Sequence, residues 1–297
     1  MELLFSKEKF SQEFKEQLGF IDADIRYERL KPSIEAATDE FIDIVGIPTY
    51  NTLVQGTADK ALLAMAKYAI ALKAYINYAP TADLSVTNNG RVIRRDEHLV
   101  SPYQWQIEAN DEALEQLYYR ALDRLLKFMV KNSIPINLQK YRHSDLKVPT
   151  LEDFENFFNI NNSYLLYLKL IPAMREFERI ELSPRLHSIN IIDEQLKNLI
   201  QIAEVNYALA WGMRRLNIQL FPKGVLQEQK MTSAGKTQKQ GQSIEYLQTA
   251  MLFEKDTANY LLKIEALIQK ITVAAPSSTK IDLPELGFGS DDKFVDV

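Results

Sequence analysis

The sequence predicts a mainly α-helical protein, with helical bundles, β-hairpin inserts and an extended C-terminal arm. Long stretches repeat apolar residues every three or four positions, which is the period of an amphipathic helix. One strand-like stretch, "LSVTNNGRVIRR" at residues 84–95, interrupts these helices. Residues 276–297 are rich in proline, serine, glycine and acidic residues, a composition typical of a tail that does not fold by itself.

Two amphipathic helices are expected near the N-terminus. Ser6 can cap the first, which Gly19 would end, and Pro32 suits the first turn of the second, which Gly46 would end. The apolar stripe of the second helix comprises Ile34, Ala37, Phe41, Ile44 and Val45.

A core helix and a long helix follow, on either side of the strand-like stretch. The alanine-rich residues 57–78 place Leu62, Met65, Ala66, Ala69, Leu72 and Ile76 on one side. Residues 101–132 predict a helix of roughly 45 Å that starts at Ser101 and Pro102. Its apolar face contains Leu114, Leu117, Tyr118, Ala121, Leu122, Leu125 and Phe128.

Residues 84–95 predict a β-hairpin. Asn89 and Gly90 suit the positive φ angles of a type I′ turn, and valines and isoleucine flank them. A two-stranded hairpin is only marginally stable by itself, so it needs a surface to pack on. It either caps its own bundle or pairs with a neighbouring subunit, where Arg91, Arg94 and Arg95 would supply charge.

The proline-containing residues 133–150 are the best candidate for a boundary between two halves, at 1–140 and 141–275, followed by the arm at 276–297. The second half predicts a short capped segment at 150–161 and a helix kinked near Pro172. Two further helices carry Leu196, Leu199, Ile200, Ala203, Tyr207 and Ala210, and then Leu247, Ala250, Met251, Ala258, Leu261, Ile268 and Ile271.

Both halves have the same order of core helix, glycine-centred insert and long helix. Gly90 and Gly224 take the same place in that order, the second within an insert at 217–241. One interpretation is an internal duplication, in which case residues 57–131 should superpose on residues 191–271. The other is coincidence among helices, since residue identity between the halves is low.

Composition excludes several classes of function. The chain has no cysteine, which rules out disulfides, thiolate metal sites and cysteine nucleophiles. Its formal charge of −5 argues against broad binding of a nucleic-acid backbone. The first 20 residues do not resemble a signal peptide, and no stretch is apolar for long enough to cross a membrane, so we expect a soluble protein.

No pattern of catalytic or cofactor-binding residues emerges. His98, His143 and His187 are far apart in sequence, and no phosphate-binding glycine motif or nucleophile elbow is present. Carboxylate pairs such as Glu108 with Glu112 or Glu152 with Asp153 are better interpreted as solvated helix faces than as acid–base pairs. We therefore expect no enzyme, no cofactor and no metal site.

The residues that favour contacts with other proteins lie in the inserts, at the start of the long helix and in the arm. Aromatic residues crowd that helix, including Tyr103, Trp105, Tyr118 and Tyr119, and suit either its core face or an interface. The candidate interface residues are Asn89, Gly90, Arg91, Val92, Arg94, Arg95, Trp105, Gly224, Leu286 and Phe288.

Three adjoining segments, "DKALLAMAKYAIALKAY", "LSVTNNGRV" and "SPYQWQIEANDEALEQLYYRALDRLLKFM", resemble a family of virion proteins from phages and prophages of Bacteroidetes-type bacteria. That family is similar to head–tail connectors, also called adaptors. The resemblance is strongest over residues 55–132. It implies a small helical bundle with a protruding hairpin and a C-terminal arm, assembled into a ring of typically twelve subunits under the portal. The present chain is about twice the usual size of such adaptors, which a duplication would explain.

The resemblance also implies the partners and the location. These are further copies of the chain, the portal, other neck and tail proteins, and DNA that passes through the lumen without specific binding, with no membrane involved. The protein would be made in the bacterial cytoplasm and reside in the virion neck. Alternatives are another neck or tail-completion protein, a helical enzyme built from scattered carboxylates, and a helical binding module with a ligand between the halves.

Overall fold

The computed structural model describes residues 2–8, 10–21, 25–82, 85–87, 90–92, 102–137, 145–187, 193–222 and 238–274. The described chain is mainly helical, which confirms the predicted class. The C-terminal arm at 276–297, Gly224 and most of the second insert lie outside the described residues.

The first half contains five helices among its described residues and one small antiparallel sheet. Their bounds are α1 Phe10–Gln17, α2 Tyr27–Val45, α3 Ile47–Val54, α4 Lys60–Ala82, β1 Ser85–Thr87, β2 Gly90–Val92 and α5 Gln104–Lys131. The second half contains α6 Leu151–Glu155, α7 Tyr164–Phe177, the π-helical turn η2 Glu178–Leu182, α8 Ser183–Leu186, α9 Glu194–Arg215, the 3₁₀ turn η3 Ile218–Leu220 and α10 Gln238–Ala274.

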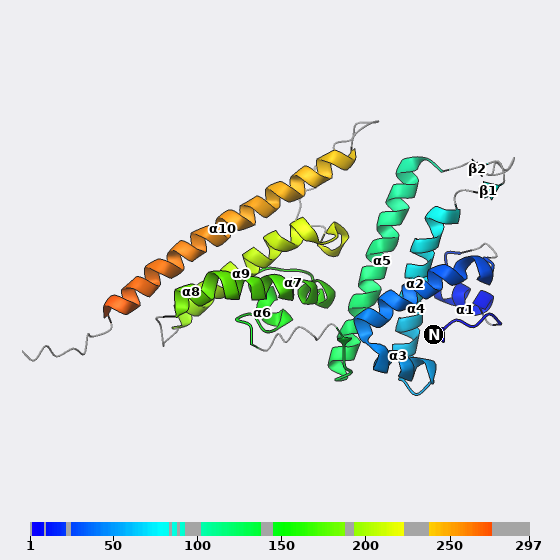
Figure 1. The fold of residues 1–297 in the computed structure, drawn as a ribbon, viewed down its shortest axis with the longest axis horizontal. Helices are drawn as coiled ribbons and strands as arrows, with labels where there is room; N and C mark the ends of the chain where they lie inside the picture. Colours follow the sequence, from blue (N-terminus) through cyan, green and yellow to red (C-terminus); the bar gives the residue numbers. More distant parts are fainter. Residues whose placement is uncertain are drawn as a thin grey trace, which may run out of the picture.

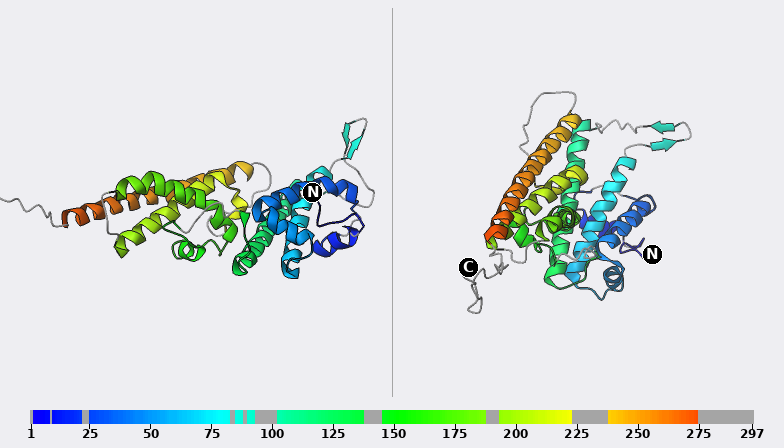
Figure 2. Two further views of the ribbon diagram at one scale, coloured as in Figure 1. Left: turned by 60° about the horizontal axis from the view of Figure 1, so that its bottom comes forward. Right: turned by 60° about the vertical axis from the view of Figure 1, so that its left-hand side comes forward.

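The described residues of the two inserts form different secondary structure. In the first, Ser85 pairs with Val92 and Thr87 pairs with Gly90, and the two strands stand clear of the helices (Figures 1 and 2). In the second, Ile218–Leu220 form the 3₁₀ turn η3, residues 238–241 belong to α10, and none of the described residues of the insert lies in a strand. A strand-like insert in the second half is therefore not found in the described part of the chain.

Gly46 ends α2 and lets α3 begin immediately. Its φ of +92° lies in the region that residues with a Cβ rarely adopt. Pro48 then occupies the first turn of α3, where its missing N–H costs no hydrogen bond. The sequence predicted the glycine stop but not the short helix behind it.

The two halves share one hydrophobic core. α4 packs between α2 and α5, α5 contacts α7, and α9 packs between α7 and α10 (Figure 1). One continuous cluster of buried residues contains Leu72 from α4, Leu125 from α5, Leu166 from α7 and Leu209 from α9. A second, smaller cluster joins Phe177 and Ile200 to Ile264 of α10. The molecule is elongated, with the hairpin and the end of α10 at opposite ends of its long axis (Figure 1).

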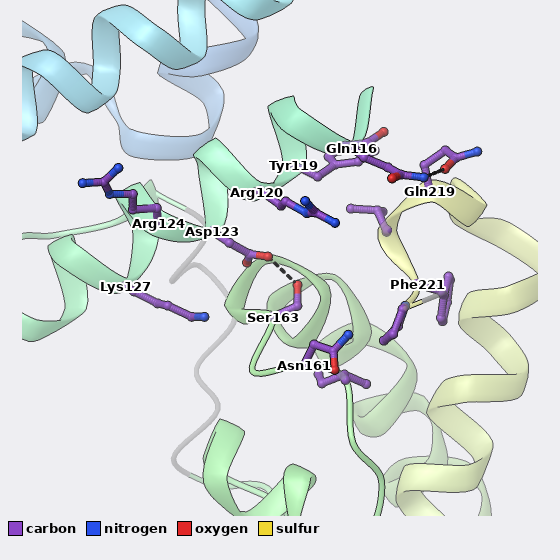
Figure 3. A pocket seen from close by; sticks show the side chains of 13 residues that line it. Gln116, Tyr119, Arg120, Asp123, Arg124, Lys127, Asn161, Ser163, Gln219 and Phe221 are labelled. Carbon is purple, nitrogen blue, oxygen red and sulfur yellow. Dashed lines mark hydrogen bonds between the residues drawn. The ribbon is translucent and has the colours of Figure 1, made fainter. Parts of the chain in front are cut away.

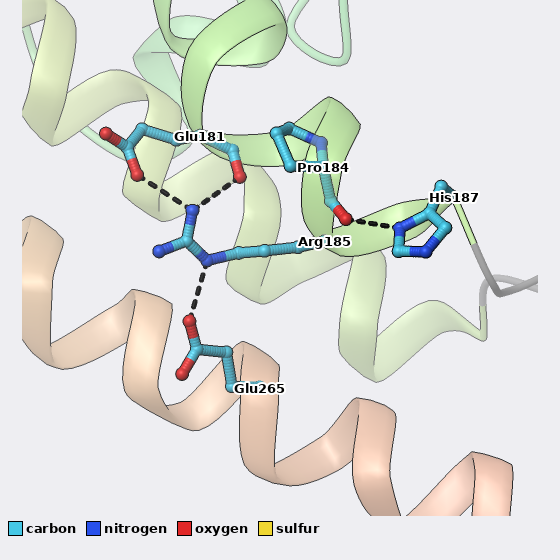
Figure 4. Close-up of polar contacts among 5 residues, drawn as sticks. All are labelled: Glu181, Pro184, Arg185, His187 and Glu265. Atoms are coloured by element: carbon cyan, nitrogen blue, oxygen red, sulfur yellow. Dashed lines mark hydrogen bonds and ion pairs between the residues drawn. The ribbon is translucent and has the colours of Figure 1, made fainter.

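A polar anchor also fastens α10 to the body. Arg185 of α8 donates from Nε to the Glu265 carboxylate of α10 at 2.8 Å, and from Nη1 to the Glu181 carboxylate at 2.8 Å (Figure 4). The same Nη1 also donates to the main-chain carbonyl oxygen of Glu181. The wider π-helical turn therefore supplies both a side-chain and a main-chain acceptor to one guanidinium.

Several sequence expectations need correction. α1 begins at Phe10 rather than beside Ser6, and α2 begins at Tyr27, which places Pro32 beyond its first turn. On α5, Leu117 is 38% exposed because the helix turns that side away from its neighbours.

The largest error concerns the inner face of α10. Leu247 and Met251 are 48% and 61% exposed, and Ala258 is exposed as well. Other residues of the predicted face are correctly placed: Ala250 is buried, and Leu261, Ile268 and Ile271 pack against the smaller cluster. The most buried positions are Ala250, Thr257 and Ile264, which repeat at seven-residue intervals against α9. Because α10 carries two apolar stripes and packs mainly on one helix, one stripe stays exposed.

Both halves do contain a helix pair separated by an insert, α4 with α5 and α9 with α10. The internal duplication stays a prediction, because a shared order of elements does not establish that the two units superpose.

Gly212 of α9 allows a close approach that a larger residue would prevent. A Cβ there would lie 2.6 Å from Leu170 Cδ2 and 3.1 Å from Phe221 Cζ, and both neighbours are buried. We expect Gly212→Ala to lower the free energy of unfolding by about 1 to 2 kcal/mol, because the core must shift to admit a methyl group. Chemical denaturation measures this loss, and Ala210→Gly on the same helix provides a cavity-forming comparison. An unchanged midpoint for Gly212→Ala would show that the core absorbs the methyl group.

Candidate functional site

The start of α5 presents two aromatic side chains beside the hairpin. Tyr103 is 68% exposed and Trp105 is 65% exposed, so neither belongs to the core of the chain. The first turn is nevertheless ordered, because the Tyr103 N–H donates to the Gln106 side chain at 3.0 Å and Gln104 donates to Glu108 at 2.9 Å. Large aromatic side chains that are exposed to solvent on an ordered helix are typical anchors of protein interfaces.

The sequence-predicted interface residues divide into three groups. Trp105 lies exposed on the first turn of α5, and its role in an interface stays a prediction. Gly90, Arg91 and Val92 form β2, whose backbone pairs with that of β1 in an antiparallel sheet. The remaining candidates lie outside the described residues: Asn89, Arg94, Arg95, Gly224, Leu286 and Phe288. Tyr118 differs from Trp105, because it is only 7% exposed and packs in the core.

A cleft of about 510 Å³ lies between the two halves (Figure 3). One wall is the middle of α5, and the other is formed by residues 160–163 and 219–222. Gln116 of α5 donates to Gln219 across one edge of the cleft at 2.8 Å. The position between the halves is the one expected for a binding module, but the lining combines cationic and polar side chains with apolar ones instead of being purely apolar.

Three basic side chains line the α5 wall. Arg120, Arg124 and Lys127 follow one another at four and three residues, which places them on one face of the helix. All three are exposed, and none forms an ion pair or hydrogen bond with a described residue. Asp123, which also lines the cleft, interacts electrostatically with Lys127, so three positive charges face one carboxylate. In a chain with a net charge of −5, this is a local excess of positive charge.

Asp123 fixes the floor of the cleft. Its carboxylate accepts from Ser163 Oγ at 2.9 Å and from the Leu165 N–H at 2.8 Å, which joins α5 to the first turn of α7 (Figure 3). Burial raises the pKa of Asp123, while the hydrogen bonds from Leu165 and Ser163 oppose the increase. Both carboxylate oxygens are thus engaged in holding the fold.

The opposite wall is shaped by a tight loop. Asn161 and Asn162 have φ angles of +57° and +54°, a conformation that asparagine adopts more readily than most residues. Glu155 holds the loop by accepting from the Ile160 N–H at 3.0 Å and from the Asn162 N–H at 2.6 Å. Tyr119, Phe221 and Pro222 add an apolar surface to the cationic one, although Phe221 is itself largely buried.

Glu204 is the most unusual ionisable group in the described chain. Its side chain is fully buried in α9, and neither carboxyl oxygen has a hydrogen-bond partner among the described residues. Burial, followed by the nearby Glu178 charge, raises the pKa of Glu204 to about 9. The group is therefore protonated at neutral pH and is enclosed by core residues rather than lining a cleft.

The cationic side chains of the cleft can pair with an anion. The cleft contains one carboxylate, Asp123, which already serves as a structural acceptor.

Within the described ranges, no three His, Asp or Glu side chains lie close enough to hold a metal ion. His187 bonds to the Pro184 carbonyl (Figure 4), and His98 and His143 lie outside the described residues. No described helix is both long and apolar enough to cross a membrane.

Comparison with known proteins yields one match. Residues 30–141 match a family model described as a family of unknown function, DUF6712. The matched region covers less than half of the chain and runs from α2 to just beyond α5, so it includes the hairpin, Trp105 and the cationic wall of the cleft. No curated protein and no solved structure matches the chain.

Proposed function

We propose that this protein is a non-enzymatic structural subunit that assembles into a ring in the neck of a tailed phage, between portal and tail. Two observations carry the proposal: the hairpin stands clear of the helices (Figure 2), and Tyr103 and Trp105 are exposed at the start of α5, the helix that follows the hairpin. The hairpin offers unpaired strand edges to a neighbour, and the two aromatic residues offer anchors.

Two further features support a role in assembly. The molecule is elongated, and its hairpin and the end of α10 lie at opposite ends, so each copy offers widely separated surfaces for its neighbours (Figure 1). α10 also leaves Leu247, Met251 and Leu262 between 48% and 64% exposed. Exposed apolar surface of this extent on a helix is typical of protein contacts. Another neck or tail-completion role would use the same surfaces.

The double substitution Tyr103→Ala/Trp105→Ala tests the aromatic anchor. We expect the purified variant to self-associate at least tenfold more weakly than the wild type, because two interface anchors are lost. Light scattering across a dilution series measures the change in mass. Ile180→Ala serves as the control, since Ile180 is 50% exposed in η2 away from the hairpin. If the double variant self-associates as strongly as Ile180→Ala, then Tyr103 and Trp105 do not contribute to the interface.

A further inference from the structure

We propose that the cationic cleft between α5 and the loops at 160–163 and 219–222 binds the acidic, apolar segment 281–288 of a second copy of this chain. The inference rests on the self-association in the proposed function and names the contact between copies. It does not require that the assembly is a closed ring.

Charge is the first argument. The cleft presents Arg120, Arg124 and Lys127. Only Lys127 interacts electrostatically with a carboxylate of the cleft, Asp123, and none of the three forms a salt bridge with a described residue. Residues 276–297 contain five acidic side chains against two lysines, and Asp282 and Glu285 are three positions apart. A peptide with carboxylates at this spacing can pair with more than one of three cations that span two helical turns.

Apolar surface is the second argument. Around the cations, the cleft includes Tyr119, Phe221 and Pro222. The sequence "IDLPELGF" at 281–288 alternates acidic residues with Leu283, Leu286 and Phe288. An acidic peptide with apolar side chains matches this mixed lining better than a nucleic-acid backbone does, because a backbone would leave the apolar wall uncovered.

Reach favours a second copy over the same chain. Phe253 and Glu254 of α10 contact Phe158 and Arg214, which precede the cleft-lining residues 160–163 and 219–222 in sequence. From Glu254 to Ala274 the helix advances roughly 30 Å away from that point. The seven residues that lead on to Ile281 span at most about 25 Å when fully extended, so Ile281 stops short of the level of Glu254. Within one copy only the later residues of the segment could reach the cleft, whereas the whole segment of a second copy can lie in it. Figure 1 shows α5 far from the C-terminal end of α10.

Photo-cross-linking within the full chain tests the contact. Phe288 is replaced by p-benzoylphenylalanine, and heavy-isotope and light-isotope chains are mixed in equal amounts before irradiation. We expect cross-links from position 288 to residues 119–127 or 219–222, with heavy–light pairs among them. Cross-links that are confined to one copy, or that fall elsewhere on the surface, would overturn the proposal.

Charge-reversing variants make the test specific. Arg120→Glu/Arg124→Glu should reduce the cleft cross-link at least tenfold, whereas Lys131→Glu/Lys169→Glu, with the same change in charge outside the cleft, should leave it unchanged. A single-stranded oligonucleotide serves as a competing polyanion. If it binds through Arg120 and Arg124 while no cleft cross-link forms, the site takes phosphate instead and the proposal fails.

The same samples separate this proposal from the proposed function. A closed ring without cleft cross-links would refute only the docking of segment 281–288. Heavy–light cleft cross-links in an open or dimeric assembly would support the docking and refute only the ring.

Discussion

Replacing Glu204 by glutamine is expected to raise the free energy of unfolding by about 3 kcal/mol at pH 7. The native protein must keep this buried carboxyl protonated, because its pKa is raised from 4.5 to about 9. The unfolded chain releases that proton above its ordinary pKa, so unfolding is favoured as the pH rises. The glutamine amide has a similar shape and no proton to release, which removes this contribution.

The pH dependence gives the sharper test. A carboxyl with a raised folded-state pKa contributes full stability below the unfolded pKa of 4.5, and this stability is lost as the pH rises to about 9. The difference between Glu204→Gln and the wild type should therefore grow by about 1.4 kcal/mol per pH unit between pH 5 and 8. Urea denaturation at several pH values measures it, with exposed Glu152→Gln as the control. A difference that does not change with pH would mean that Glu204 is not buried in its protonated form.

Asp123→Ala is expected to lower the free energy of unfolding by about 2 to 4 kcal/mol. The substitution leaves the Ser163 hydroxyl and the Leu165 N–H without their acceptor, and it removes the negative charge at the start of α7. Because Asp123 joins α5 to α7, the loss should loosen the contact between the two halves.

Asp123→Asn provides the matched control. The amide oxygen can still accept from Leu165, and the amide nitrogen can donate to Ser163, so we expect at least half of the lost stability to return. Thermal denaturation ranks the three proteins, and hydrogen exchange at Leu165 locates the change. If Asn is as destabilising as Ala, the charge of Asp123 matters more than its hydrogen bonds.

The helices were predictable because their signals are local. The stripe of Ile34, Ala37 and Phe41 and the stop at Gly46 depend only on spacing and backbone conformation, and the structure confirms both. The exposure of Leu247 and Met251 was not predictable, because α10 has two apolar stripes and only the packing partner decides which is buried.

The cleft illustrates what the sequence alone leaves undecided. The spacing of Arg120, Arg124 and Lys127 was visible and indicates one basic helix face. The opposite wall comes from residues 160–163 and 219–222, which only the tertiary fold brings to α5. The burial of Glu204 was likewise not predictable from the sequence, because a glutamate in a helix usually lies in solvent. In the structure, neighbouring elements cover the part of α9 that carries Glu204.

The central claim is that this chain is a structural subunit whose copies assemble with one another. Its most direct test is the mass and shape of the purified full-length protein by light scattering and electron microscopy. We predict a closed ring whose mass is an integer multiple of 34.2 kDa. A protein that stays a monomer, alone and with the portal of its own phage, would contradict the claim.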